Sequence, residues 1–152
     1  MPRFILFRHG KAVSREEAGS DEERWLLPEA KREVEAVARL LPFKPVEVLS
    51  SPLRRARETA EIIAGVWGVA VRVVEELAPG RASCSSLNGL ELEGRVLVGH
   101  NPDLEELVSC LTGGRVKLEA GGYAYVEAEG LAEGAGRLRA LVQPWLAARA
   151  VS

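Results

Sequence analysis

The chain contains few of the residues that would indicate metal, nucleic-acid or membrane chemistry. Its 152 residues include two histidines, two cysteines and one methionine, and aromatic residues make up 5%. The formal net charge of −2 lacks the basic excess that nucleic-acid binding requires. No apolar run approaches the roughly 20 residues of a membrane span, and the apolar stretch at residues 4–7 is short for a secretory signal. These absences predict a cytoplasmic protein without a nucleic-acid or membrane partner.

The scarcity of cysteine and histidine also argues against several kinds of site. Four residues separate Cys110 from Arg115, one too few for the Cys-x5-Arg loop of cysteine-dependent phosphatases, and Cys84 has no arginine at that interval. A zinc site built from these cysteines and the histidines would lack a close pair of ligands. No Gly-x-x-x-x-Gly-Lys nucleotide loop occurs. We therefore expect no metal and no cofactor, and we interpret both cysteines as free thiols.

The hydrophobic residues, 47% of the chain, are enough for the core of one compact domain, which we assign to residues 1–152. Apolar runs typical of strands occur at residues 3–7, 46–49, 69–74, 95–98, 123–128 and 138–142. Helical periodicity occurs at residues 28–41, 52–67 and 102–112. This alternation predicts an α/β fold: a mainly parallel sheet flanked by helices on both faces. No helix separates the last two strands, so we expect an antiparallel edge there.

Polar motifs stand where three of the predicted parallel strands end. "RHG" at residues 8–10 follows the first strand, "SSPLRRARETA" at 50–60 follows the second, and "VGHNP" at 98–102 contains the end of the fourth. Ligands of open parallel sheets bind beyond the carboxyl ends of the strands, so we expect these segments to converge. Ser51 and Asn101 each precede a proline, which predicts two helix N-caps whose free amides favour anions.

Both histidines of the chain, His9 and His100, lie in these motifs. Four arginines accompany them: Arg8, Arg54, Arg55 and Arg57. A guanidinium group matches the oxygens of a phosphate with paired hydrogen bonds. The residues therefore predict a phosphate pocket that contains a nucleophile or a base. Helical periodicity does not choose between Arg54 and Arg55.

The three motifs, in this order and at these intervals, resemble the histidine phosphatase superfamily over residues 3–112. The resemblance implies the α/β fold of that superfamily and a phosphatase that needs no metal. It also implies that His9 is the nucleophile, which attacks phosphorus and forms a phosphohistidine that water then hydrolyses. Arg8 would hold the phosphoryl oxygens and neutralise their charge.

The same resemblance assigns further roles in the pocket. The pattern Ser-Pro-x-x-Arg-Ala selects Arg55 as the second phosphate-binding arginine, which leaves Arg54 and Arg57 as surface residues. His100, as a cation, would complete the pocket. Because Gly10 has no side chain, it would leave room for the phosphate to approach His9.

Three more residues are candidates for contacts with the substrate. Arg24 stands near a position where relatives have an arginine before Pro-Leu-Thr, although the residues after it here are "WLL". Asn101 is interpreted first as a helix cap and second as a substrate contact. Glu76 stands after the third strand, where broader family members have a general acid, and it is a candidate for that role. The alternative interpretation of Glu76 is an exposed glutamate at a strand end.

The compact length and the "VGHNP" motif look most like the SixA-type phosphohistidine phosphatases. This implies that the substrate is phosphohistidine on a signalling or phosphocarrier protein and that inorganic phosphate is the product. A broad small-molecule phosphomonoesterase of the same superfamily and a non-catalytic phosphate-binding module remain open. A phosphoglycerate mutase fits less well, because residues 77–94 are too short for a deep lid.

Overall fold

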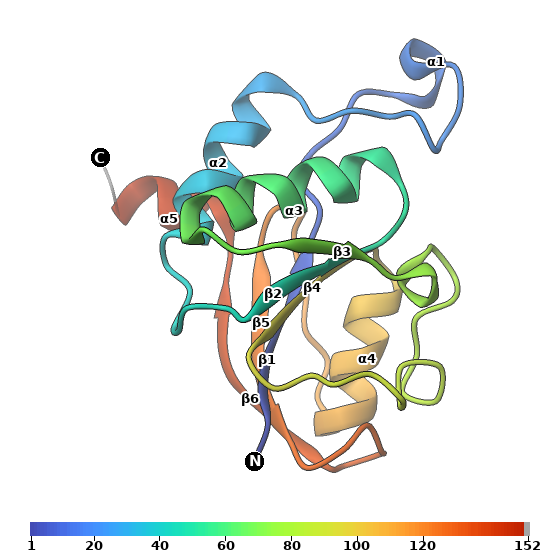
Figure 1. Ribbon diagram of the computed structural model, residues 1–152, viewed down its shortest axis with the longest axis vertical. Helices are drawn as coiled ribbons and strands as arrows, with labels where there is room; N and C mark the ends of the chain where they lie inside the picture. Colours follow the sequence, from blue (N-terminus) through green and yellow to red (C-terminus); the bar gives the residue numbers. More distant parts are fainter. Residues whose placement is uncertain (151–152) are drawn as a thin grey trace.

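The structure is a computed structural model that describes residues 1–150 (Figure 1). Its sheet has six strands: β1 (Arg3–Arg8), β2 (Glu47–Ser50), β3 (Val71–Val73), β4 (Arg95–Gly99), β5 (Tyr123–Ala128) and β6 (Gly136–Val142). The strand order is β3-β2-β4-β1-β5-β6. The first four strands in this order pair in parallel, whereas β5 runs antiparallel to β1 and β6 runs antiparallel to β5. The predicted mainly parallel sheet with an antiparallel edge is confirmed.

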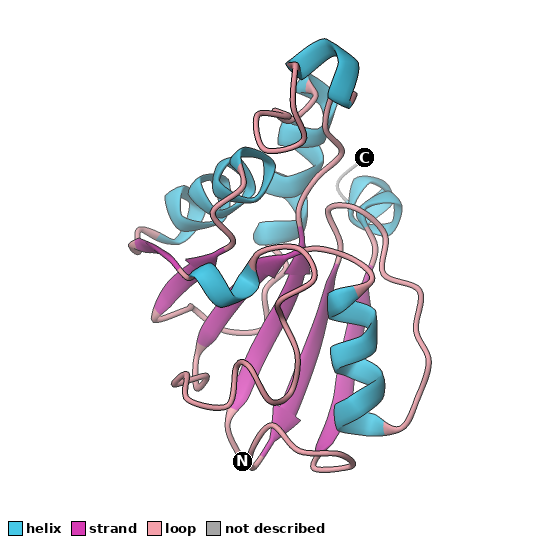
Figure 2. Ribbon diagram, turned by 90° about the vertical axis from the view of Figure 1, so that its right-hand side faces the viewer, coloured by secondary structure: helices cyan, strands magenta, loops and turns pink. Residues whose placement is uncertain are grey.

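Helices cover both faces of the sheet (Figures 1 and 2). One face packs against α2 (Pro28–Ala38), α3 (Arg54–Trp67) and α5 (Pro144–Ala150), and the other packs against α4 (Asp103–Thr112). The short helix α1 (Arg15–Ala18) stands away from the sheet at the top of Figure 2. No helix within residues 1–150 is long and apolar enough to cross a bilayer.

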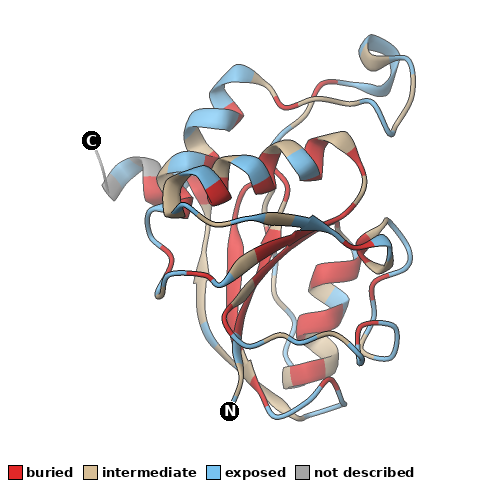
Figure 3. Ribbon diagram, viewed as in Figure 1, coloured by how far each residue is buried: buried red, intermediate tan, exposed pale blue. Residues whose placement is uncertain are grey.

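The central strands are apolar throughout because both of their faces are buried. In β1, Phe4 and Leu6 belong to the hydrophobic cluster beneath α4, while Ile5 and Phe7 belong to the cluster beneath α2 and α3. All four side chains are fully buried. Figure 3 shows the same distribution, with buried residues along the central strands and on the inner sides of the helices. The two-sided burial accounts for the continuous apolar run in the sequence.

The structure also contains short elements that the sequence did not reveal. These are α1, α5 and the 3-10 helix η1 (Glu75–Leu77). The four residues of α1 are held by a cap, in which the Ser14 hydroxyl accepts a hydrogen bond from the amide of Glu17. Such elements are shorter than the roughly 10–12 residues over which helical periodicity can be recognised. The strand predicted at 69–74 is also shorter, and only Val71–Val73 pair as β3.

The expectation of two free thiols is wrong, because Cys84 and Cys110 form a disulfide. The bond joins the segment between η1 and β4 to the last turns of α4, and the two cysteines are 26 residues apart in the sequence. No local pattern indicates this pairing, since it depends on how the long segment packs beside α4.

Candidate active site

Three strand ends meet at one edge of the sheet, as the order β2-β4-β1 requires. The amide of His9 donates to the carbonyl of Gly99 at 3.2 Å, and the amide of Ser51 donates to the carbonyl of Val98 at 3.0 Å. The ring centres of His9 and His100 are 5.1 Å apart. The structure therefore brings the three motifs together at the edge where we expected them to converge.

His9 is held in a state suited to nucleophilic attack. Its Nδ1 lies 2.8 Å from the carbonyl oxygen of Gly10, which fits a neutral ring with its proton on Nδ1 and a lone pair on Nε2. The side chain is 8% exposed. Burial lowers the pKa of His9 to about 3, and the nearby His100, Arg55 and Arg8 act in the same direction. The imidazole is therefore neutral at neutral pH.

Arg55 stands against the free nitrogen of His9. It is the second residue of α3 and is 5% exposed. Its Nε lies 3.3 Å from His9 Nε2. Its two terminal nitrogens bind Asp21: Nη1 donates to the backbone oxygen at 2.8 Å, and Nη2 donates to a carboxylate oxygen at 3.3 Å. A group attached to His9 Nε2 would therefore lie next to a fixed positive charge.

Asp21 is a functional candidate that the sequence did not reveal. Its other carboxylate oxygen accepts a hydrogen bond from Arg24 Nη1 at 3.2 Å, and Arg24 Nε donates to the carbonyl of Val13 at 2.8 Å. Burial opposes the charge of Asp21, but the hydrogen bonds and charges of Arg24 and Arg55 outweigh it and lower the pKa of Asp21. Arg24 is thereby linked to the cluster through Asp21. The sequence "SDEER" offers no reason to prefer Asp21 over its acidic neighbours.

His100 is neutral, in contrast to the expected cation. Its Nε2 lies 2.7 Å from the Ser51 hydroxyl, and the residue is 3% exposed. Burial lowers the pKa of His100 to about 4, and the charge of Arg55 contributes in the same direction. A doubly charged phosphoryl group would favour the protonated ring, so a positive His100 requires such a ligand.

Two buried nitrogens of the cluster lack a hydrogen-bond partner within residues 1–150: Arg8 Nε and His100 Nδ1. Arg8 Nη1 donates to the carbonyl of Leu118 at 3.0 Å. Burial lowers the pKa of Arg8, and the carboxylates of Glu105 and Glu119 oppose this shift. Buried polar atoms without partners are costly, so these two nitrogens favour a polar ligand at the cluster.

Gly10 is required for helix packing, and its role in phosphate approach remains a prediction. A Cβ atom at this position would lie 2.9 Å from Val34 Cγ2, on α2. The amide of Gly10 donates to the Thr59 hydroxyl at 3.0 Å, and that hydroxyl donates to the carbonyl of Arg55 at 2.8 Å. The glycine thus lets β1 and α2 pack closely while its amide connects the His9 segment to α3.

Ser51 and Asn101, which we expected to be the N-caps of α3 and α4, do not occupy the N-cap positions in the structure. The cap of α3 is Leu53, and Ser51 accepts a hydrogen bond from the Leu53 amide at 3.3 Å just before the helix. The cap of α4 is Pro102, which follows a cis peptide bond. Asn101 instead donates from Nδ2 to Glu105 at 3.0 Å and to the Leu118 carbonyl at 2.9 Å. Asn101 and Arg8 therefore both donate hydrogen bonds to the Leu118 carbonyl. A contact between Asn101 and the substrate remains a prediction.

Glu76 lies in η1, directly after β3. The backbone of Val74 donates to the carbonyl of Ser50 at 2.8 Å, which places the end of β3 at the same edge as the cluster. Within the described part of the chain, no hydrogen bond or ion pair joins Glu76 to the residues of the cluster. Its role as a general acid remains a prediction.

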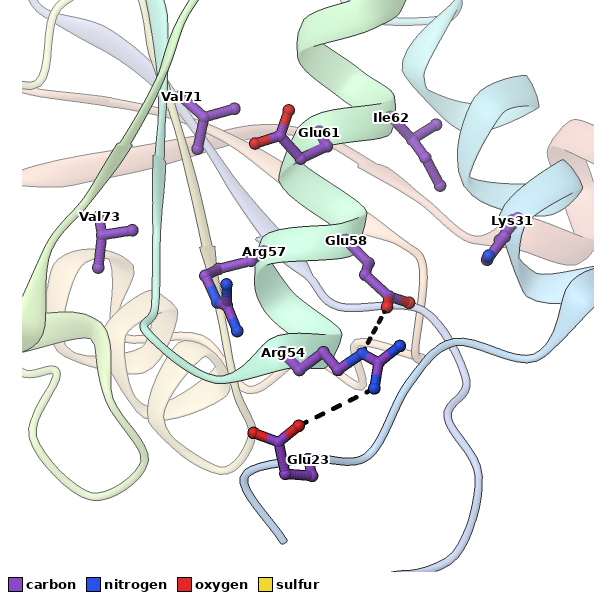
Figure 4. A pocket seen from close by; sticks show the side chains of 9 residues that line it. All are labelled: Glu23, Lys31, Arg54, Arg57, Glu58, Glu61, Ile62, Val71 and Val73. Carbon is purple, nitrogen blue, oxygen red and sulfur yellow. Dashed lines mark hydrogen bonds and ion pairs between the residues drawn. The ribbon is translucent and has the colours of Figure 1, made fainter. Parts of the chain in front are cut away.

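In contrast to the buried Arg55, Arg54 is partly exposed and Arg57 is exposed. They line a groove of about 660 Å³ on the outer side of α3 (Figure 4). Arg54 pairs with Glu58 at 2.8 Å and with Glu23 at 3.9 Å, while Arg57 Nε donates to the carbonyl of Pro52. Over residues 1–150, no group of three or more His, Cys, Asp or Glu side chains is arranged to hold a metal ion.

Comparison with known proteins identifies the family. Residues 4–79 match the model of the histidine phosphatase superfamily (branch 1). The chain belongs to this superfamily. An uncharacterized protein of Picosynechococcus sp. is 34% identical over 151 residues, which cover 90% of this chain and 88% of that protein.

Solved structures of similar fold include phosphatases whose names state different substrates. The protein histidine phosphatase SixA, in complex with tungstate, has a TM-score of 0.81 and 23% identity, with 95% of this chain and 98% of that chain covered. The mycobacterial glucosyl-3-phosphoglycerate phosphatase has a TM-score of 0.68 and 18% identity, with 94% and 98% covered. The predicted superfamily and its fold are thus confirmed, and the phosphatase class follows from membership of the histidine phosphatase superfamily.

Proposed function

We propose that the protein is a metal-independent phosphatase that uses His9 as its nucleophile. The observation that carries this proposal is the buried, neutral His9, whose Nε2 faces Arg55 Nε at 3.3 Å. A neutral imidazole can attack phosphorus, whereas a protonated one has no free electron pair. Arg8, Arg55 and His100 surround this position and supply the donors that would hold phosphoryl oxygens.

The reaction proceeds in two transfers. His9 Nε2 attacks phosphorus, the bond to the leaving group breaks, and the leaving atom departs with the electron pair and takes up a proton. Water then attacks the phosphorus on His9, loses a proton, and returns the electron pair of the Nε2–P bond to the ring. Inorganic phosphate and neutral His9 result.

We infer that the substrate is phosphohistidine on a signalling or phosphocarrier protein in the cytoplasm. The chemistry of the leaving group supports this choice. Asp21 contacts Arg55, and its lowered pKa keeps it deprotonated at neutral pH, so it is a poor proton donor. An alkoxide needs a proton donor in order to leave, whereas a phosphohistidine ring that is already protonated on its second nitrogen leaves as neutral imidazole. The similarity of the fold to the protein histidine phosphatase SixA supports the same choice.

A broad phosphatase for small phosphoesters is the second candidate. The similarity of the fold to a mycobacterial glucosyl-3-phosphoglycerate phosphatase favours it. This candidate needs a proton donor for the alcohol product, and Glu76, near the same edge, is the residue we would assign.

The test compares turnover of a phosphohistidine protein and of p-nitrophenyl phosphate, with EDTA present throughout. The variants are wild type, His9→Ala and the matched control Arg57→Ala, which changes an exposed arginine of the same helix as Arg55. We expect His9→Ala to abolish both activities, Arg57→Ala to retain them, and wild type to prefer the phosphohistidine protein. Unchanged activity in His9→Ala would refute the mechanism. Phosphate binding without turnover in wild type would indicate the binding-module alternative.

A further inference from the structure

A second cavity opens beside Arg8, outside the cluster of His9, Arg55 and His100. Its volume is about 330 Å³, and its lining includes Arg8, Lys11, Glu33, Glu119 and Trp145. Lys11 follows the His9 segment, Glu33 comes from α2, Glu119 comes from the segment before β5, and Trp145 comes from α5. Four parts of the chain that are distant in sequence therefore form one cavity, and it shares an arginine with the phosphate site.

We propose that this cavity is a subsite for the leaving group and that it receives the imidazole ring of an N-phosphorylated histidine. This inference rests on the proposed function, since it assumes that the phosphoryl group is transferred to His9. Arg8 belongs to both places, and we therefore place the ring of a substrate whose phosphoryl group lies at the cluster in this cavity.

Trp145 provides the surface on which such a ring would stack. Its side chain is 55% exposed, although it is among the largest apolar groups of the protein. Indole rings interact favourably with other aromatic rings and, more strongly, with cations placed over their face. An imidazole is planar and becomes cationic when it takes up a proton, so it can use both kinds of contact.

The charges of the cavity match the two ends of a phosphorylated imidazole. Arg8 and Lys11 suit the phosphoryl oxygens, while Glu33 and Glu119 suit a ring that is positive because its second nitrogen is protonated. The charge of Glu119 also acts on Arg8, which shows that this carboxylate lies near the shared arginine.

In the transfer step, the ring is protonated on its second nitrogen when the P–N bond breaks, so the electron pair of that bond stays on the phosphorylated nitrogen and neutral imidazole departs. Carboxylates beside the ring favour this protonated form over the neutral ring, which would have to leave as imidazolate, and they therefore raise kcat/KM. A p-nitrophenolate leaving group carries a developing negative charge, which the same carboxylates would oppose. The subsite thus selects for imidazole over anionic leaving groups.

The experiment measures kcat/KM for three substrates in Trp145→Ala, Trp145→Phe and the control Leu146→Ala. Leu146 is the adjacent residue of α5 and is 48% exposed, but it does not line the cavity. The substrates are free phosphoimidazole, a phosphohistidine protein and phosphoserine. We expect Trp145→Ala to lower kcat/KM about 5-fold for the first two, as loss of a cation–π contact would. Phosphoserine turnover should be unchanged, Trp145→Phe should retain most activity, and Leu146→Ala should resemble wild type.

Glu33→Gln provides an independent arm, because Glu33 lies on α2 and is outside the cluster. It should lower kcat/KM for phosphoimidazole and leave the value for p-nitrophenyl phosphate unchanged or higher. Glu119→Gln is not suitable, since Glu119 also acts on Arg8.

Several results would overturn the subsite. Equal losses for all three substrates in Trp145→Ala would show a structural role for Trp145, and no loss would show that the ring does not reach it. A loss confined to the phosphohistidine protein would show that Trp145 contacts the polypeptide instead of the ring. In each of these cases wild type still hydrolyses phosphoimidazole, so the proposed function stands. Wild type that hydrolyses phosphoserine but not phosphoimidazole would instead refute the proposed substrate class.

Discussion

Reduction of the Cys84–Cys110 disulfide should destabilise the protein without disabling its chemistry. The bond closes a loop over 26 residues. The chain-entropy relation for a loop of this length gives about 3.5 kcal/mol of stabilisation at 25 °C, because the cross-link restricts the unfolded chain. For a protein of about 150 residues, this corresponds to a fall in Tm of roughly 7–14 °C.

The same perturbation should have little effect on turnover, because neither cysteine contacts the cluster. The disulfide-linked segment touches the start of α4 through the amide of Gly80, which donates to Asp103 at 2.8 Å. His100 precedes α4 and is held separately by Ser51. We therefore expect kcat/KM to change by less than about twofold, since no hydrogen bond of the reacting groups is lost.

The assay is urea unfolding of the wild type with and without dithiothreitol, together with the double variant Cys84→Ser/Cys110→Ser. The double variant should match reduced wild type and should not respond to dithiothreitol. Equal unfolding midpoints for oxidised and reduced wild type would refute the entropic argument. Loss of turnover at a temperature where the reduced protein remains folded would show that the catalytic cluster depends on the disulfide, contrary to our expectation.

Two further predictions concern residues of the site. Gly10→Ala should lower the free energy of unfolding by about 1–3 kcal/mol, because its Cβ would lie 2.9 Å from Val34 Cγ2. Urea unfolding checks this, and adding Val34→Ala should recover part of the loss that Gly10→Ala causes. Stability should also fall as the pH drops below about 6.5, where histidines of the unfolded chain take up protons but His9 and His100, with pKa values of about 3 and 4, do not. Unfolding midpoints from pH 8 to pH 5 measure this fall, and a fall of equal size in His9→Ala would contradict the assignment to His9.

The parts of the structure that the sequence predicts are those governed by local pattern. Two-sided burial forces β1 to be apolar at Phe4, Ile5, Leu6 and Phe7, and the stripe of α3 repeats at helical spacing through Ala56, Ala60 and Ile63. The carboxyl ends of parallel strands lie at one edge by topology, so the placement of the strands also places the motifs that follow them. These regularities determine the sheet, the main helices and the meeting of the three motifs.

The features that the sequence does not predict depend on contacts between distant segments. Asp21 stands in a stretch without periodicity, and its importance follows only from the way that stretch lies across α3 and reaches Arg55. Trp145 and Lys11 are 134 positions apart by their residue numbers and line one cavity only because α5 packs against α2. The packing role of Gly10 is not predictable for the same reason, since its neighbour Val34 belongs to a separate helix.

The distribution of charge connects these observations with the proposed chemistry. The positive charge of the site resides on Arg8 and Arg55, whose basicity withstands burial, while burial beside these arginines keeps His9 and His100 neutral. Asp21 balances part of this charge from the far side of Arg55 and leaves Arg55 Nε directed at His9. In the proposed reaction, a phosphoryl group would therefore meet fixed cations and the neutral imidazole of His9 together, which is the combination that phosphoryl transfer to an imidazole requires.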